Sequence, residues 1–452
     1  MLNKEISDIV KKLRDAYYGI AGVEAPTLIP SGGSLAESVG AFPAFYIQGN
    51  YCAKSVAGLC TPCFYSKFPN PNISREILEE SIYSQCKYIL DNFEELVLNN
   101  QYGKIGVNCD NLKYKEKEPV AVIISPTGSY FSEYEFSRNI RIKILKELVE
   151  KGEKYKVDII LHIEAHAEDV LASEEYLKNS EELDLLRQLN TKVIMGFESS
   201  DEFTRNVLYN KNLKLETYER AVSILKQFGL DVGSFVFCGL APHNNIESKQ
   251  DMLNTVKYLK KLQVFPVLMF PNIQPFTIPE VLYVNDEFDL IEPLTVLSAV
   301  YESLDLIYEN ESNPYWLIPE PVGGPPMPMF NIFYNRKACV TSEVTNRVLH
   351  ELLIELRLTR NIVQFKKRFE LIMNSDEYQK YEDMLSIEQK KTLTIEKKVQ
   401  MMIATLNFLL ERYIREQRPA LDKIEMNTQN EMYNKINERG DENEFANKKG
   451  IN

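Results

Sequence analysis

The chain has 452 residues, of which 44% are hydrophobic and 26% are charged, which indicates a globular protein with ample material for a core and excludes a disordered chain. The 52 Lys and Arg against 65 Asp and Glu leave a formal net charge of −13, which disfavours a tight grip on nucleic-acid phosphates. We find no uninterrupted apolar run of about 18 residues and no leader-like N-terminus, and therefore expect a cytoplasmic protein with no membrane contact.

Residues 1–41 read as an N-terminal helix followed by a Pro- and Gly-bearing lead-in loop. From Phe42, short apolar strand candidates alternate with longer stretches of helical period. The strand candidates are Phe42–Gln48, Val120–Ser125, Val157–His166, Val193–Glu198, Val232–Leu240 and Val264–Phe270. The helices between them are Ser74–Phe93, Ser137–Lys151, Glu174–Leu189, Leu215–Phe228 and Ile246–Leu262. This alternation predicts an α/β fold, a partial parallel barrel of the (β/α)6, TIM-barrel-like type over residues 42–275.

The second half of the chain changes character. Residues 276–340 are rich in Pro and aromatic side chains, and because proline removes backbone donors we expect a covering loop rather than a helix or a central strand. From Thr341, apolar stripes such as Val348, Leu352, Leu353 and Leu356 predict a C-terminal helical region over 341–426. Residues 427–452 are polar, which predicts a disordered tail.

Three of the seven cysteines carry the strongest chemical signal. Cys52, Cys60 and Cys63 follow the first strand candidate at a C-x7-C-x2-C spacing, and thiolates in one loop are typical ligands of iron–sulfur clusters and zinc. The next cysteine is Cys86 and the first histidine is His162, so no fourth ligand lies nearby. One interpretation is a cluster with an open iron; the other is a structural site completed from a distance. The position at the end of a barrel strand favours the open cluster.

With this loop after the first strand of a partial barrel, the sequence resembles the radical S-adenosylmethionine superfamily. The long first gap followed by Cys60-Thr-Pro-Cys63 is most similar to the branch of the elongator catalytic subunit and, within it, to the radical subunit of archaeosine synthase. The resemblance covers about residues 42–330. It implies a [4Fe-4S] cluster on the three cysteines, and S-adenosylmethionine that is cleaved reductively to a 5′-deoxyadenosyl radical. It also implies a one-electron donor such as a flavodoxin or ferredoxin.

Polar residues at the ends of later strands fit the same resemblance. Strict alternation puts His162, Glu164 and His166 of the third strand on one face, which we expect to be the barrel interior. The resemblance implies that the cofactor contacts are Thr127, Gly128, Ser129, Glu164, Glu198 and Ser199. Asn272 and Gln274 are candidate substrate contacts, and His162 and His166 are candidates for substrate contact or proton transfer.

The net charge favours a small polar or nucleoside-like substrate, from which the radical would abstract hydrogen, over a long stretch of RNA. Two alternatives remain at this point: a tRNA-modifying subunit that acts with a partner protein, and a non-catalytic zinc or iron–sulfur protein. The remaining cysteines are less informative. Cys86 lies on an apolar helical stripe and Cys238 near a strand end, so we expect both to be buried thiols.

Overall fold

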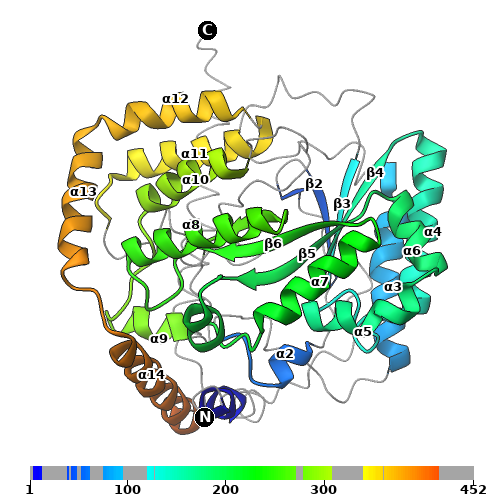
Figure 1. Cartoon of the computed structure of the whole chain (residues 1–452), viewed down its shortest axis with the longest axis horizontal. Helices are drawn as coiled ribbons and strands as arrows, with labels where there is room; N and C mark the ends of the chain where they lie inside the picture. Colours follow the sequence, from blue (N-terminus) through cyan, green and yellow to red (C-terminus); the bar gives the residue numbers. More distant parts are fainter. Residues whose placement is uncertain are drawn as a thin grey trace, which may run out of the picture.

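A seven-stranded sheet forms the centre of the protein in this computed structural model, which describes residues 4–12, 38–39, 42–47, 52–61, 75–94, 120–126, 128–270, 278–307, 339–359 and 361–416. The strands are β1 (Ser38–Val39), β2 (Phe42–Ile47), β3 (Val120–Pro126), β4 (Ile159–Ala165), β5 (Lys192–Glu198), β6 (Asp231–Phe237) and β7 (Phe265–Met269). They lie in chain order, with β1 antiparallel to β2 and every later neighbour parallel (Figure 1). Parallel strands in sequential order form the wall of a barrel.

Helical segments lie on the outside of this sheet and, in the case of α2 (Ala53–Val56) and the π-helical turn η3 (Thr204–Leu208), at one end of it (Figure 1). The others are α3 (Arg75–Asp91), α4 (Arg138–Tyr155), α5 (Ala167–Leu177), α6 (Glu181–Gln188), α7 (Leu215–Gln227) and α8 (Asn245–Lys261). A further helix spans residues 4–12. The α/β class and the partial parallel barrel with a C-terminal helical extension are therefore confirmed, whereas the domain boundaries stay a prediction.

One helix of the sequence prediction is wrong. The segment Glu174–Leu189 is divided between α5 and α6, which are separated by a short turn. Asn179 in this turn has a φ of 58°, a left-handed conformation that asparagine tolerates better than most residues. Ser180 then begins α6 as its N-cap, since its side chain accepts a hydrogen bond from the backbone N–H of Leu183 at 3.1 Å. The N-cap at Ser180 thus divides a stretch of continuous helical period into two helices.

The covering loop expected over residues 276–340 is also wrong for part of its length. Residues Ile278–Val284 form α9 and Pro293–Ile307 form α10. Pro279 and Pro293 lie in the first turn of their helices, where a missing N–H leaves no intrahelical bond unmade. The rest of the Pro-rich stretch, at 276–277 and 308–338, lies outside the described residues.

The C-terminal region is helical in its described residues, which end at residue 416, so the predicted boundaries at 341 and 426 stay a prediction. It contains α11 (Glu343–Thr359), α12 (Ile362–Met373), α13 (Asp376–Gln389) and α14 (Ile395–Glu416). In α11 the buried stripe includes Leu349 in place of the expected Val348, which is 36% exposed. Helix α14 returns to the N-terminal helix, where Met402 and Leu406 pack in one buried cluster with Ile6 (Figure 1). The predicted tail at 427–452 lies outside the described residues.

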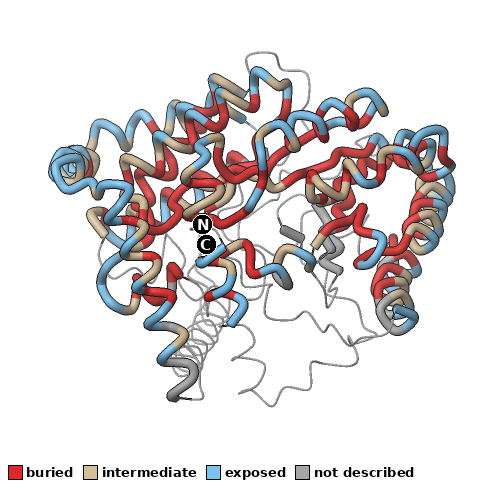
Figure 2. Tube along the Cα trace, turned by 60° about the horizontal axis from the view of Figure 1, so that its bottom comes forward, coloured by how far each residue is buried: buried red, intermediate tan, exposed pale blue. Residues whose placement is uncertain are grey.

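The core lies between the sheet and its helices. Leu161, Ile163 and Ala165 of β4 belong to the large buried cluster, together with alternate residues of β5 such as Val193 and Met195. The buried strands run through the middle of the molecule, and the exposed residues lie on the outer sides of the helices (Figure 2). Because side chains alternate along a strand, the other face of β4 and β5 points into the barrel.

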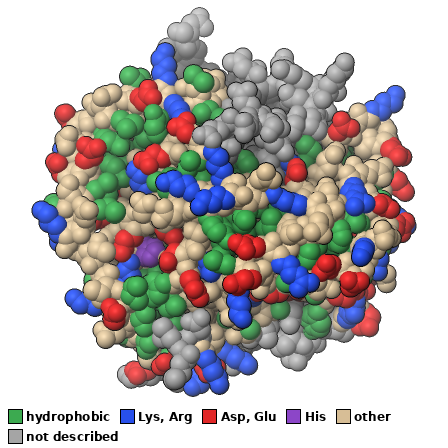
Figure 3. All heavy atoms as spheres, in the orientation of Figure 1, with side chains coloured by type: hydrophobic (Ala, Val, Ile, Leu, Met, Phe, Trp, Pro, Cys, Tyr) green, Lys and Arg blue, Asp and Glu red, His purple; other side chains and the backbone are tan. Residues whose placement is uncertain are grey.

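The surface carries mixed charge. Lys and Arg side chains lie interspersed with Asp and Glu across the face shown in Figure 3. Two residues of the short basic segment of α12 make ion pairs with acidic neighbours, Lys366 with Asp305 and Arg368 with Glu355. Within the described residues, no helix combines the length and apolar character needed to cross a bilayer.

Candidate functional site

The cysteine loop, defined here as residues 52–61, leaves β2 at the end of the sheet from which the other strands run into their helices. Cys52 and Cys60 are partly exposed, in contrast to Cys86 and Cys238, which are buried as predicted. Cys63 lies outside the described residues. Among the residues that are described, no three Cys, His, Asp or Glu side chains are grouped so that they could hold a metal ion.

Two acidic residues from later segments hold the N-terminal part of the cysteine loop. The backbone N–H of Ala53 donates to Oε1 of Glu135 at 3.1 Å. Lys54 forms an ion pair with Glu168, which lies in the first turn of α5. Burial chiefly raises the pKa of Glu135, to about 8, while the hydrogen bonds from Ser129 and Ala53 offset part of this rise. The loop is thereby tied to the ends of both β3 and β4.

The predicted glycine turn lies against the same carboxyl group. The N–H of Ser129 donates to Oε2 of Glu135, and a Cβ on Gly128 would overlap that carboxyl group. The Ser129 hydroxyl accepts from the backbone N–H of His166 at 3.0 Å. The N–H of Tyr130 donates to the carbonyl of Glu164 at 2.8 Å. The structure thus brings Gly128, Ser129, Glu164 and His166 together at one edge, whereas Thr127 lies outside the described residues.

His166 lies at the start of α5, where it occupies the N-cap position. Its Nδ1 is 3.3 Å from Oδ2 of Asp169. Burial disfavours the charged form of Asp169, but hydrogen bonds from His166 and Ser129 and the charge of Lys54 outweigh this effect, so the pKa of Asp169 is below its ordinary value. An ionised Asp169 orients the imidazole of His166. His162, which lies four residues earlier within β4, is fully buried.

The C-terminal part of the cysteine loop is hydrogen-bonded to the segment after η3. The N–H groups of Cys60 and Thr61 donate to the carbonyls of Asn210 and Tyr209, each at 3.1 Å. The Asn210 side chain in turn donates to the carbonyl of Gly58 at 3.0 Å. Gly58 has a φ of +75°, and a Cβ there would overlap the carbonyl oxygen of Ser7. The N-terminal helix therefore packs directly on the loop.

A buried ion pair lies next to these hydrogen bonds of Cys60 and Thr61. Nζ of Lys211 is 2.6 Å from Oε1 of Glu198, and the two side chains are only 9% and 5% exposed. Burial lowers the pKa of Lys211, but the negative charges of Glu198 and Cys60 outweigh it and raise that pKa above its ordinary value. Gly196 makes room for the pair, since a Cβ at this position would lie 2.6 Å from Oε1 of Glu198. The sequence prediction named Glu198, but it did not find Lys211.

Glu198 has one further unusual property. Its second oxygen, Oε2, is buried and has no hydrogen-bond partner within the described part of the chain. Its backbone φ is 69°, and that of Cys60 is 59°. Left-handed backbone at residues other than glycine is uncommon and is found preferentially at functional sites. Two residues chosen from the sequence therefore share this conformation at one end of the barrel.

Ser199 faces a different environment. Its hydroxyl donates to Oδ1 of Asp251 in α8 at 2.6 Å, and burial is the main cause that raises the pKa of Asp251 to about 7. Asp201 caps the following turn, as its side chain accepts from the N–H of Thr204 at 2.7 Å. The proposed cofactor contact of Ser199 stays a prediction, as do the substrate roles of Asn272 and Gln274, which lie outside the described residues.

Comparison with known proteins adds weak similarities. No protein-family model matches the sequence. An uncharacterized protein of Methanocaldococcus jannaschii is 24% identical over 189 residues, which are 42% of this chain and 43% of the relative. Elp3 of Methanocaldococcus infernus, solved with an N-terminal deletion, superposes with a TM-score of 0.38 and 11% identity, over 70% of this chain and 64% of that one.

The radical S-adenosylmethionine methyltransferase TsrM from Kitasatospora setae appears in two solved structures. The one with tryptophan and a cofactor analogue bound has a TM-score of 0.29 and 12% identity, over 53% of this chain and 39% of that chain. The one with cobalamin and a [4Fe-4S] cluster has a TM-score of 0.29 and 13% identity, over 53% and 40%. The chain spans less than two thirds of the length of the M. jannaschii relative and of the solved structures to which it is similar.

Proposed function

We propose that this protein is a radical S-adenosylmethionine enzyme, with a [4Fe-4S] cluster on Cys52, Cys60 and Cys63. The observation that carries the proposal is the placement of the cysteine loop at the barrel end. There Glu135 bonds the loop to the turn at Ser129, whose hydroxyl contacts His166, and the N–H groups of Cys60 and Thr61 bond to the segment that precedes Lys211, the ion-pair partner of Glu198. When bound, a reduced cluster supplies one electron that cleaves S-adenosylmethionine to methionine and a 5′-deoxyadenosyl radical.

The residues fit an iron–sulfur cluster by their chemistry and exposure. Thiolates are soft ligands suited to iron–sulfur clusters, and Cys52 and Cys60 are both partly exposed. The thiols of Cys86 and Cys238 are buried, and burial raises the pKa of each, which disfavours the thiolate form that binds metals. The cysteine loop therefore has the properties of a ligand segment, which the two buried cysteines lack.

The same end of the barrel fits a small cofactor that carries hydroxyl or amine donors. Oε2 of Glu198 is a buried acceptor that requires a donor, and leaving such an atom unsatisfied costs roughly 1–3 kcal/mol. A ribose hydroxyl or an amine would supply that donor. The turn at Gly128 and Ser129 lies next to the cysteine loop, and its half-buried residue Gly128 would orient the amino-acid end of the cofactor. In this proposal the protein binds, orients and excludes water.

We further propose a small polar or nucleoside-like substrate, from which hydrogen is abstracted, and a small one-electron donor protein. The net charge of −13 supports this choice, as does the pairing of Lys366 and Arg368 with acidic residues. His166 is the candidate for a proton transfer or substrate hydrogen bond, because Asp169 orients its ring. Submicromolar binding of bulk tRNA at about 150 mM salt, where exposed charges are screened, would instead favour a tRNA-modifying subunit.

The test is anaerobic reconstitution of the full chain with iron and sulfide, followed by reduction in the presence of S-adenosylmethionine. We expect broad visible absorption, about four irons per chain as in a [4Fe-4S] cluster, and release of 5′-deoxyadenosine. C52A, C60A and C63A should each lose both signals, while C86A, which removes a buried thiol on α3, should keep them. Zinc in place of iron, or loaded iron without 5′-deoxyadenosine, would contradict the proposal.

A further inference from the structure

Glu135 connects two segments that lie far from each other in the sequence. Its Oε1 accepts from the N–H of Ala53, which follows Cys52 and is 82 residues away. Its Oε2 accepts from the N–H of Ser129 in the turn after β3. The side chain is nearly fully buried, with the residue 4% exposed. One carboxyl group therefore joins the start of the cysteine loop to the glycine turn.

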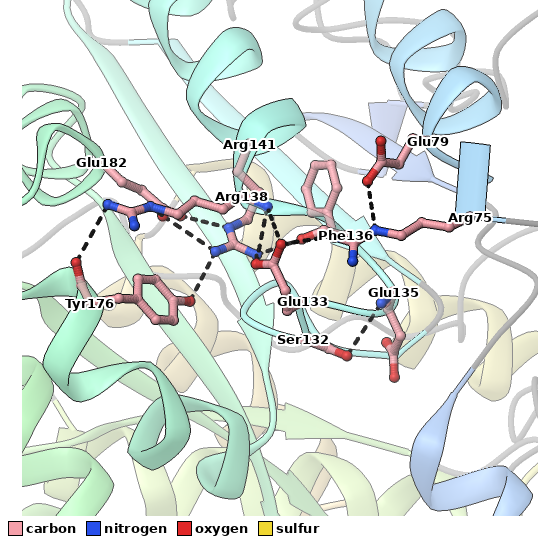
Figure 4. A network of polar contacts seen from close by, with 10 residues as sticks. All are labelled: Arg75, Glu79, Ser132, Glu133, Glu135, Phe136, Arg138, Arg141, Tyr176 and Glu182. Atoms are coloured by element: carbon pink, nitrogen blue, oxygen red, sulfur yellow. Dashed lines mark hydrogen bonds and ion pairs between the residues drawn. The ribbon is translucent and has the colours of Figure 1, made fainter. Parts of the chain in front are cut away.

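The backbone that carries Glu135 is itself held in place. Arg141 of α4 donates to the carbonyl of Phe136 and pairs with Glu182 at 2.6 Å, with both charged side chains fully buried. The N–H of Glu135 donates to the Ser132 hydroxyl at 3.3 Å. Figure 4 shows Glu133 pointing into the guanidinium group of this network, while Glu135 points away from it. The two acidic residues therefore have different partners: Glu133 contacts Arg141, whereas Glu135 accepts from backbone N–H groups.

We propose that Glu135 is a positioning residue that clamps the cysteine loop to the turn at Gly128 and Ser129, and so sets the distance between Cys52 and the cofactor seat. The inference rests on the proposed function for its last step. The clamp itself follows from the hydrogen bonds alone. The start of the loop is the four-residue helix α2, which is too short to be stable by itself, so bonds from other segments have to hold it in place.

The chemistry of the clamp explains why a carboxyl group is present. Both partners are backbone N–H donors, so the side chain has to offer two acceptor oxygens at once. An amide offers one acceptor and would turn its NH2 group towards the second donor. Gly128 permits the close approach, since any side chain there would overlap the carboxyl group. Aspartate would be one methylene too short to span both segments.

Hydrogen exchange of the full chain tests the clamp without any cluster. In E135A we expect the amides of Ala53 and Ser129 to exchange about tenfold faster or more, which corresponds to about 1.4 kcal/mol for each lost bond. The matched control is E133A, which removes the acidic side chain that accepts from the N–H of Arg138 at 3.2 Å. That variant should accelerate exchange at Arg138 and leave Ala53 and Ser129 unchanged, because Arg141 keeps its bonds to Phe136 and Glu182 when its 3.6 Å contact with Glu133 is removed.

Cofactor titration tests the positioning role. In reconstituted E135A the cysteines are intact, so we expect full iron loading and a tenfold higher S-adenosylmethionine concentration for half-maximal 5′-deoxyadenosine release. E133A should match the unmodified protein. E135Q keeps the side-chain volume and one acceptor, so it should accelerate exchange at one of the two amides even if E135A folds poorly.

The outcomes separate the two proposals. Unchanged exchange at Ala53 and Ser129 in folded E135A would overturn the clamp. Faster exchange with an unchanged cofactor titration would overturn the positioning role while the proposed function stands. If the unmodified protein assembles no cluster, the proposed function fails, and the exchange experiment still decides whether Glu135 holds the loop.

Discussion

Replacing Lys211 with methionine would leave the carboxylate of Glu198 buried without its charged partner. The pair is separated by 2.6 Å, and Coulomb's law with an effective dielectric constant of about 20 gives an attraction of roughly 6 kcal/mol. Desolvation offsets part of this attraction, so the expected cost of removing one partner is about 3–5 kcal/mol in the free energy of unfolding. E198Q should be similarly destabilised, since it leaves the ammonium group buried.

The assay is guanidinium denaturation of the two single variants and of K211M/E198Q. We expect the double variant to recover at least about 2 kcal/mol relative to the sum of the single losses, because it removes both charges. K192M is the matched control. Lys192 is also buried, at 3% exposed, but its partner Asp231 is 58% exposed, so water can solvate the carboxylate that remains.

K192M should therefore cost about 1 kcal/mol or less from the loss of its ion pair. A K211M cost no larger than that of K192M, or strictly additive losses in the double variant, would refute the reasoning. In that case the two charges would contribute to stability independently. Lys211 would then not hold Glu198 as a preformed acceptor beside the cysteine loop.

Three further predictions concern the same end of the barrel. G196A should cost about 1–3 kcal/mol, because its Cβ forces the Glu198 and Lys211 side chains apart; calorimetry showing an unchanged melting temperature would contradict this. G58A should destabilise the protein more than G229A. Both glycines have a positive φ, of +75° and +73°, but only at Gly58 would the Cβ overlap the backbone of Ser7. Equal losses of unfolding free energy in the two variants would show that this overlap is unimportant. The folded pKa of Asp251, about 7, lies above the unfolded value of 3.8, so its contribution is fully present below pH 3.8 and is lost as pH rises through 7. Relative to D251N, the unmodified protein should lose about 1–3 kcal/mol between pH 4 and 8 in urea denaturation, and parallel curves for the two proteins would exclude this role.

The sequence by itself determined the parts of this protein that depend on local pattern. Alternating apolar strands and amphipathic helices predicted the parallel sheet in chain order, and the helical stripe with Cys86 predicted a packed thiol. Strand alternation also predicted which face of β4 enters the core, since Leu161 and Ile163 pack against the helices. Each of these features follows from a period of a few residues, so neighbouring residues are sufficient to reveal it.

Local signals were less reliable where a single residue changes the backbone. Asn179 and Ser180 divide one expected helix into α5 and α6. The prolines in the first turns of α9 and α10 predicted a covering loop where the structure has helices. In both cases the residue types were typical of an interruption, but the outcome depended on where those residues lie relative to the end of a helix. A proline disrupts a helix in its interior and is tolerated in its first turn.

Only the tertiary structure decided which side chains surround the cysteine loop. Glu135 reaches Ala53 across 82 residues, and Lys54 reaches Glu168 across 114 residues, with no motif that links either pair in the sequence. Ser199 and Glu198 are adjacent in the chain, yet one bonds to α8 and the other to Lys211. The physical reason is that a periodic pattern specifies which face of an element is buried, whereas the partner of a buried polar group is set by the packing of distant elements, where burial makes an unsatisfied group costly.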